Sequence, residues 1–136
     1  MKENDKKKLY VITFLLDSGL IYLCTKKKLP RIDKLWCYTT LLLHSSFYYG
    51  LYKNNRPLLD KLHYWVFILP ILSTITKTIY TKILSLFLIL LIQYLWIIED
   101  KCILNEEGQS LGFGGITSIT TVTLNTILSF QIGKLI

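Results

Sequence analysis

With 136 residues, the chain has room for one domain, residues 1–136. It is 51% hydrophobic, and its apolar residues gather in long uncharged runs, which excludes an ordinary water-soluble domain. The net charge of +7 comes from Lys and Arg in the short gaps between these runs. There they meet anionic lipid headgroups, so we expect membrane lipids and no nucleic acid as partners.

Five apolar segments follow one another along the chain, and each is predicted to form a short helix. The strongest is residues 79–98, because Ile83 to Ile98 contains no charged residue, as in a membrane-spanning helix. The sequence therefore predicts an all-α integral membrane protein built as a helical bundle. In chain order the segments are residues 9–24, 35–52, 58–76, 79–98 and 116–132.

The number of transmembrane helices depends on the first segment, residues 9–24. Asp17 interrupts it, and a carboxylate in the middle of a bilayer costs several kcal/mol. If all five segments span, Lys and Arg are divided eight to eight; if residues 9–24 lie on the cytoplasmic surface, the division is twelve to four. The positive-inside rule then favours four spans with both termini cytoplasmic, and five spans are the alternative.

The sequence lacks the common motifs of catalysis and metal binding. It contains no HExxH, no GxSxG and no phosphate-binding glycine loop. Its three cysteines, Cys24, Cys37 and Cys102, do not have the spacing of a metal site. We therefore expect neither enzyme activity nor a cofactor. The absence of alanine, with abundant Leu, Ile, Lys, Tyr, Thr and Asn, is typical of a protein from an AT-rich genome.

Residues 110–115, Ser-Leu-Gly-Phe-Gly-Gly, resemble the Thr-Val-Gly-Phe-Gly-Asp filter of potassium channels. That filter presents rings of backbone carbonyl oxygens to the ion, and Gly112 and Gly114, on either side of Phe113, have the required spacing. The surroundings differ, because Gly115 replaces the aspartate. The alternative interpretation is a glycine-rich turn before the last helix.

A polar stripe runs along the last apolar segment. Thr117, Thr121, Asn125 and Ser129 recur every four residues, so they share one face of a helix. In lipid, such a face turns toward other helices or toward water. The stripe therefore predicts either packing between helices, within or between chains, or the lining of a pore.

Two ionisable residues, Asp17 and His44, lie inside apolar segments, where such residues are candidates for function. If both segments span the membrane, an Asp–His contact could relay protons or bind a cation. The alternative is that Asp17 lies at the interface while His44 bonds a carbonyl of a neighbouring helix. Near the same end of the first segment, Cys24 precedes a Lys-rich cluster, a setting that suits palmitoylation.

A short stretch resembles a pattern in small polytopic membrane proteins encoded by giant DNA viruses. Trp96 ends an apolar helix, and Asp100-Lys101-Cys102-Ile103-Leu104 follows. The family pattern is a helix ending in His-Trp and then Asn-Asp-x-Cys-x-Leu-Thr. This chain departs from it, since Tyr94 stands near the usual histidine and Asn105 replaces the threonine. The resemblance implies a four-helix membrane protein and no particular activity.

Together these features indicate a non-enzymatic structural or interaction component of a cellular or viral membrane. The alternative function is an oligomeric ion channel or transporter that uses the loop at Gly112–Gly114 and the polar stripe of the last helix. A homo-oligomer or other membrane proteins are the expected protein partners.

Overall fold

The computed structural model describes residues 2–26, 28–99 and 116–136, and these residues form helices joined by short connections. The expected all-α bundle is confirmed for this part of the chain. The helices are α1 (Glu3–Lys26), α2 (Arg31–Lys53), α3 (Arg56–His63), α4 (Trp65–Ser73), α5 (Ile79–Glu99) and α6 (Ile116–Leu135).

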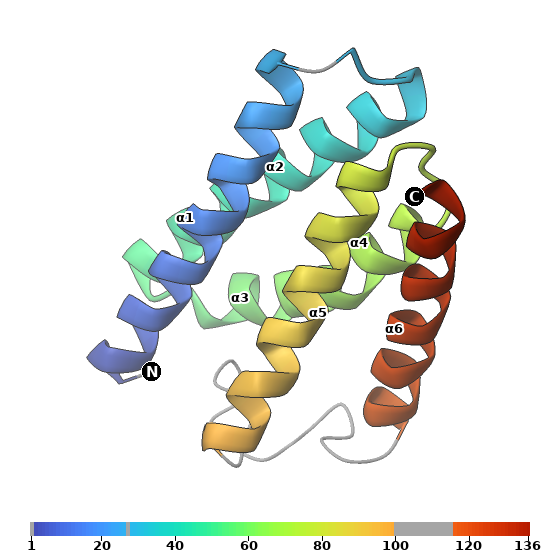
Figure 1. The fold of residues 1–136 in the computed structure, drawn as a ribbon. Coiled ribbons are helices and arrows are strands. Elements are labelled where there is room, and N and C mark those ends of the chain that lie inside the picture. The colour runs from blue at the N-terminus through green and yellow to red at the C-terminus, as the bar shows by residue number, and fades with distance from the viewer. Residues whose placement is uncertain (1, 27, 100–115) are drawn as a thin grey trace.

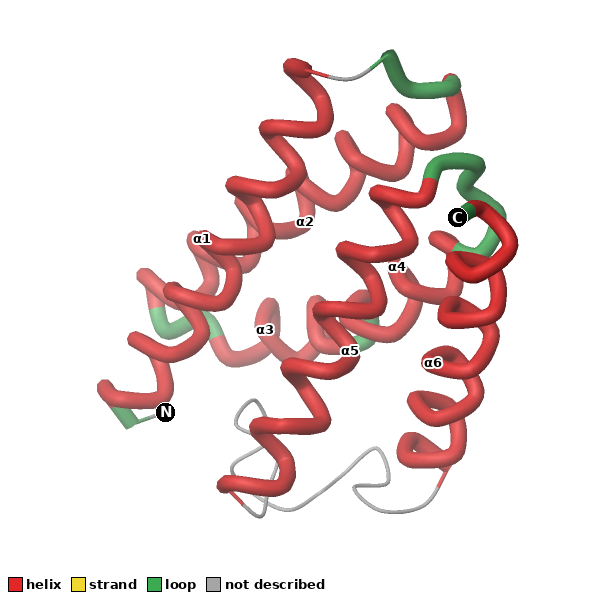
Figure 2. Tube along the Cα trace, in the orientation of Figure 1, coloured by secondary structure: helices red, strands yellow, loops and turns green. Residues whose placement is uncertain are grey.

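The long helices run up and down beside one another (Figures 1 and 2). In the view of Figure 1, α1 ascends, α2 descends, α3 and α4 return, α5 descends and α6 ascends. α5 packs against α1, α4 and α6, and α1 also packs against α2. Close approach of α1 to α5 uses Gly19, where a Cβ atom would come within 2.9 Å of Leu84.

The first apolar segment forms part of α1, which packs lengthwise against α2 and α5, and the two termini lie at opposite ends of the described bundle (Figure 1). The expectation treated Asp17 as an isolated charge, whereas its carboxylate is paired with His44 on α2. Whether four or five segments cross a membrane stays a prediction.

The third apolar segment, expected as one helix over residues 58–76, is divided at Tyr64 into α3 and α4. Asn55 caps the start of α3 by accepting a hydrogen bond from the backbone N–H of Leu58 (3.2 Å). Pro70, which supplies no backbone N–H, lies inside α4 and not at the break. The segment is therefore two short helices where one helix was expected.

Three clusters of buried apolar side chains hold the helices together. One joins α1 to α2 and α3, the second fills the α1–α2 hairpin, and the third lies between α5 and α6. Their buried members are Leu9, Leu51 and Leu59; Leu20, Leu23, Leu29, Trp36 and Cys37; and Ile89, Leu124 and Leu128. The core is thus distributed along the bundle, between neighbouring pairs of helices.

Candidate functional site

The two ionisable residues inside apolar segments meet in the structure. His44 Nδ1 lies 2.5 Å from the Oδ1 atom of Asp17, and the side chains are only 15% and 13% exposed. Because an ionised carboxylate can only accept a hydrogen bond, the tautomer of His44 with a hydrogen atom on Nδ1 is the one that pairs with an ionised Asp17. Tyr48, one turn after His44 on α2, lies near the same carboxylate. Asp17 is therefore paired across the contact between α1 and α2.

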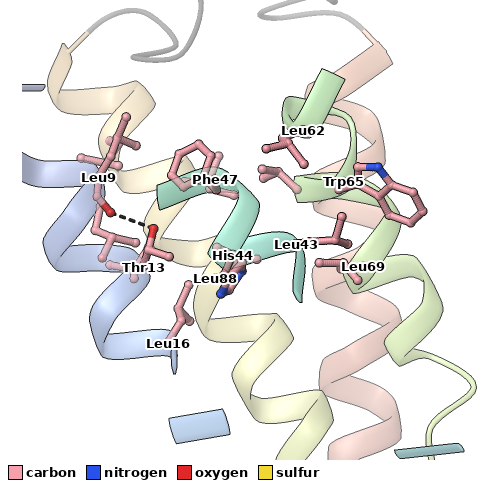
Figure 3. A pocket seen from close by; sticks show the side chains of 15 residues that line it. Leu9, Thr13, Leu16, Leu43, His44, Phe47, Leu62, Trp65, Leu69 and Leu88 are labelled. Atoms are coloured by element: carbon pink, nitrogen blue, oxygen red, sulfur yellow. Dashed lines mark hydrogen bonds between the residues drawn. The ribbon is translucent and has the colours of Figure 1, made fainter. Parts of the chain in front are cut away.

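A cavity of about 100 Å³ lies beside this pair, and we call it the His44 cavity. Its walls are mostly aliphatic and aromatic and come from α1 to α5 (Figure 3). The hydroxyl of Thr13 is already satisfied, since it donates to the Leu9 carbonyl at 2.8 Å. The fifteen lining residues are Leu9, Ile12, Thr13, Leu16, Leu43, His44, Phe47, Leu62, Trp65, Val66, Leu69, Leu88, Leu91, Ile92 and Leu95.

The other ring nitrogen of His44, Nε2, has no hydrogen-bond partner among the described residues. A second, smaller cavity of about 20 Å³ is also lined by His44 and has mostly aliphatic walls, including Leu20 and Leu84. Within the described chain, the buried Ser85 hydroxyl also has no partner. The site therefore offers an imidazole held by Asp17, with one ring nitrogen left over, beside apolar walls.

A second polar cluster joins the start of α2 to the start of α5. The fully buried Asp33 carboxylate accepts hydrogen bonds from the backbone N–H groups of Lys77 and Thr78, both at 2.9 Å. It also accepts from the hydroxyls of Thr78 (2.6 Å) and Thr81 (3.3 Å). Burial by itself raises the pKa of this carboxyl, but the hydrogen bonds, led by that of the Thr78 hydroxyl, bring the pKa below its ordinary value.

Lys82, on the first turn of α5, is the cation of this cluster, and it contacts the other end of the connection between α4 and α5. Its Nζ donates to the carbonyl oxygens of Ser73 (3.1 Å) and Thr74 (3.0 Å), at the end of α4. It also donates to Gln131 on α6 (2.9 Å). A carboxylate at the start of one helix and an ammonium at the end of another both complement the helix dipoles. This cluster connects α2, α4, α5 and α6 through hydrogen bonds.

The polar stripe of α6 packs inside the chain along part of its length. Thr121 is 1% exposed, whereas Ser129 is exposed. Asn125 donates its side-chain amide to Gln93 on α5 at 2.8 Å. The side chain of Thr117 lies outside the described residues, as do Gly112, Phe113 and Gly114 of the filter-like loop. The structure thus places Thr121 and Asn125 against α5 and brings neither to the Asp17–His44 pair.

Cys24 lies half-buried against the cluster that contains Cys37, and the two side chains are close enough to interact. The proposed palmitoylation residue therefore packs toward α2, although it retains some exposure. Across the described chain, no group of three His, Cys, Asp or Glu side chains could hold a metal ion. The residues 100–104 that carry the viral resemblance lie outside the described ranges.

Sequence reasoning missed the roles of Asp33, Lys82 and Gln93. Asp33 precedes an apolar segment and resembles an ordinary charge at a helix end, while its partners stand 44 to 48 residues further along the chain. The repeated Thr residues around Lys77 were the available signal, because hydroxyls beside a helix start often join a cap. Comparison with known protein families, curated proteins and solved structures finds no match for this chain.

Proposed function

We propose that the chain is a multi-pass integral membrane protein that serves as a non-enzymatic structural or interaction component of a cellular or viral membrane. In this arrangement all five apolar segments cross the bilayer, with the termini on opposite sides. The observation that carries the proposal is the apolar exterior of the bundle, together with charged and hydroxyl-bearing side chains that are buried beside the apolar clusters.

The outer surface supports the proposal on every long helix. Phe14 on α1 is 65% exposed, Leu42 on α2 is 69% exposed and Ile119 on α6 is 69% exposed. Many other large apolar residues share this exposure, including Ile97 on α5. Large apolar side chains exposed in such number are unfavourable in water and favourable in hydrocarbon.

The interior supports the same conclusion. Asp33, Lys82 and Ser85 are all at most 4% exposed, and Asp17 pairs with His44. In membranes, polar residues face other helices, where hydrogen bonds satisfy them, because lipid offers no partner. Buried polar pairs and an apolar exterior together describe a bundle packed for a lipid solvent.

Helix length and composition identify a single membrane-span candidate among the described residues. It is Glu3–Thr25, with a mean hydropathy of 1.4. The segment expected to be the weakest span thus meets this criterion, because its helix extends beyond residues 9–24 at both ends. The apolar part of α5, Ile79–Leu95, is shorter. The case for five spans therefore depends on the surface and on the side-by-side packing.

The rival function, an ion-conducting oligomer, depends on residues 110–115 and on a stripe open to water. In the described part of α6, Thr121 and Asn125 contribute to packing against α5. This arrangement favours the structural role over a pore lined by α6.

The experiment is a fractionation of membranes that contain the full chain with a different epitope tag at each end. We expect the protein to stay in the membrane at alkaline pH. In sealed vesicles, protease should remove one tag and spare the other, and detergent should expose both. Release by alkali would contradict a membrane-spanning protein. If protease removes both tags or spares both tags in sealed vesicles, the two termini lie on the same side, as the four-span arrangement predicts.

A further inference from the structure

We propose that the His44 cavity is a binding site for a small alcohol, meaning an apolar molecule of a few carbon atoms that carries one hydroxyl group. This ligand site is separate from the structural role proposed for the bundle. The proposal is carried by the volume of the cavity, its apolar walls and the unused nitrogen of His44.

The volume limits the ligand. The cavity measures about 100 Å³, which is smaller than the apolar cavity of about 150 Å³ that binds benzene. The ligand is therefore limited to about the size of benzene, which admits an alcohol of up to about four carbon atoms. A nucleotide, a sugar phosphate or a complete lipid is too large.

The walls determine the apolar part of the ligand. Leu9, Phe47, Leu62 and Leu88 line the cavity together with His44 (Figure 3). An apolar molecule gains contacts with these side chains and leaves water behind. A charged ligand would lose its hydration without an opposite charge reserved for it, because the Asp17 carboxylate is already paired with His44.

The imidazole determines the polar part of the ligand. Nδ1 is engaged with Asp17, so Nε2 is the ring nitrogen left for a ligand, as an acceptor or a donor according to the tautomer and protonation of the ring. A hydroxyl can accept or donate, and it satisfies Nε2 in both states. A pure hydrocarbon leaves this nitrogen unpaired. One hydroxyl is therefore the group that matches the site.

The test uses the full chain in detergent and a photoreactive diazirine derivative of 1-butanol, with labelled residues located by mass spectrometry. We expect labelling of residues that line the cavity. 1-Butanol should compete with the label about fivefold better than 1-chlorobutane at equal concentration in the micelle, since one net hydrogen bond is worth about a factor of five. 1-Chlorobutane has a similar size but no hydroxyl.

Two matched variants on adjacent positions separate the cavity from the lipid-facing surface. Leu91→Trp should fill the cavity and abolish labelling, while Leu90→Trp, at an exposed position on the same helix, should preserve it. His44→Phe should remove the preference for alcohol over chloride. Labelling confined to exposed residues, or unchanged in Leu91→Trp, would overturn the site. If 1-butanol and 1-chlorobutane compete equally in the unmodified protein, the cavity binds hydrocarbon, such as part of a lipid chain, and the proposed preference for an alcohol is wrong.

Discussion

Replacing Asp33 by Asn should destabilise the bundle strongly, although the two side chains have nearly the same shape. The carboxylate receives two backbone N–H groups and two hydroxyls at distances of 2.6 to 3.3 Å. An Asn side chain has one accepting oxygen and one donating NH₂ group. In either orientation, the NH₂ group faces at least one backbone donor of Lys77 or Thr78, which loses its acceptor.

The expected loss follows from that buried donor and from the lost charge. A buried unsatisfied donor costs about 1–3 kcal/mol, and a hydrogen bond to a charged group contributes about 1.5–3 kcal/mol. The hydroxyl of Thr81 can still donate to the Thr78 carbonyl (3.0 Å), which limits the damage. We therefore expect Asp33→Asn to lower the free energy of unfolding by about 3 kcal/mol. Unfolding by SDS in mixed micelles, followed by tryptophan fluorescence, would measure it.

The control is Asp60→Asn on α3. Asp60 pairs with Arg56 at 3.2 Å, but its side chain is 57% exposed. Such surface pairs contribute little, so the unfolding free energy should change by less than about 0.5 kcal/mol. If Asp33→Asn lowered the unfolding free energy as little as this control does, the hydrogen bonds of the Asp33 carboxylate would not stabilise the bundle as its contacts indicate.

The same carboxylate predicts a pH dependence of stability. The pKa of Asp33 in the folded protein lies below its ordinary value of 3.8, so its contribution is present above that pH and is lost as the pH falls through the folded value. The difference between the unmodified protein and Asp33→Asn should stay constant near neutral pH and shrink below pH 3.8. A difference that persists at the lowest pH would contradict the assignment.

Two further predictions test helix contacts. Gln93→Leu and Asn125→Leu should each leave the oligomeric state unchanged, because the two amides bond within one chain. Their double mutant should show a coupling of about 1 kcal/mol in the unfolding free energy. Purely additive effects would contradict this contact. Mild oxidation with diamide should join Cys24 to Cys37 by a disulfide. After denaturation, only Cys102 should then react with a maleimide polymer, and Cys24→Ser is the control. Three reactive thiols would argue against the observed packing of α1 on α2.

The positions of the helices followed well from the sequence, because uncharged runs and their flanking charges are local features. The segment at residues 79–98 became α5, Ile79–Glu99, and the segment at residues 116–132 became α6, Ile116–Leu135. The division of residues 58–76 at Tyr64 was not predicted. Pro70 was visible in the sequence, but the break precedes it and depends on how α3 and α4 pack on their neighbours.

The sequence offered a contact between Asp17 and His44 as one of two alternatives and could not choose between them. Asp17 and His44 stood out because each is ionisable within an apolar run, but a contact across 27 residues of chain depends on how α1 and α2 pack. The preference for four spans depended on the free energy of placing Asp17 in a bilayer, and it assumed that no neighbouring side chain would pair with this carboxylate. The cap at Asp33 likewise depends on bringing α2 and α5 together.

By itself, the sequence determined the all-helical class, the approximate helix ends and the apolar character of the outer faces, since these depend on local periodicity and composition. Only the tertiary structure decided that α1 packs within the bundle, that Asp17 meets His44 and that a cavity adjoins the imidazole. The physical reason is that buried polar groups are tolerated only with partners, and those partners come from distant parts of the chain.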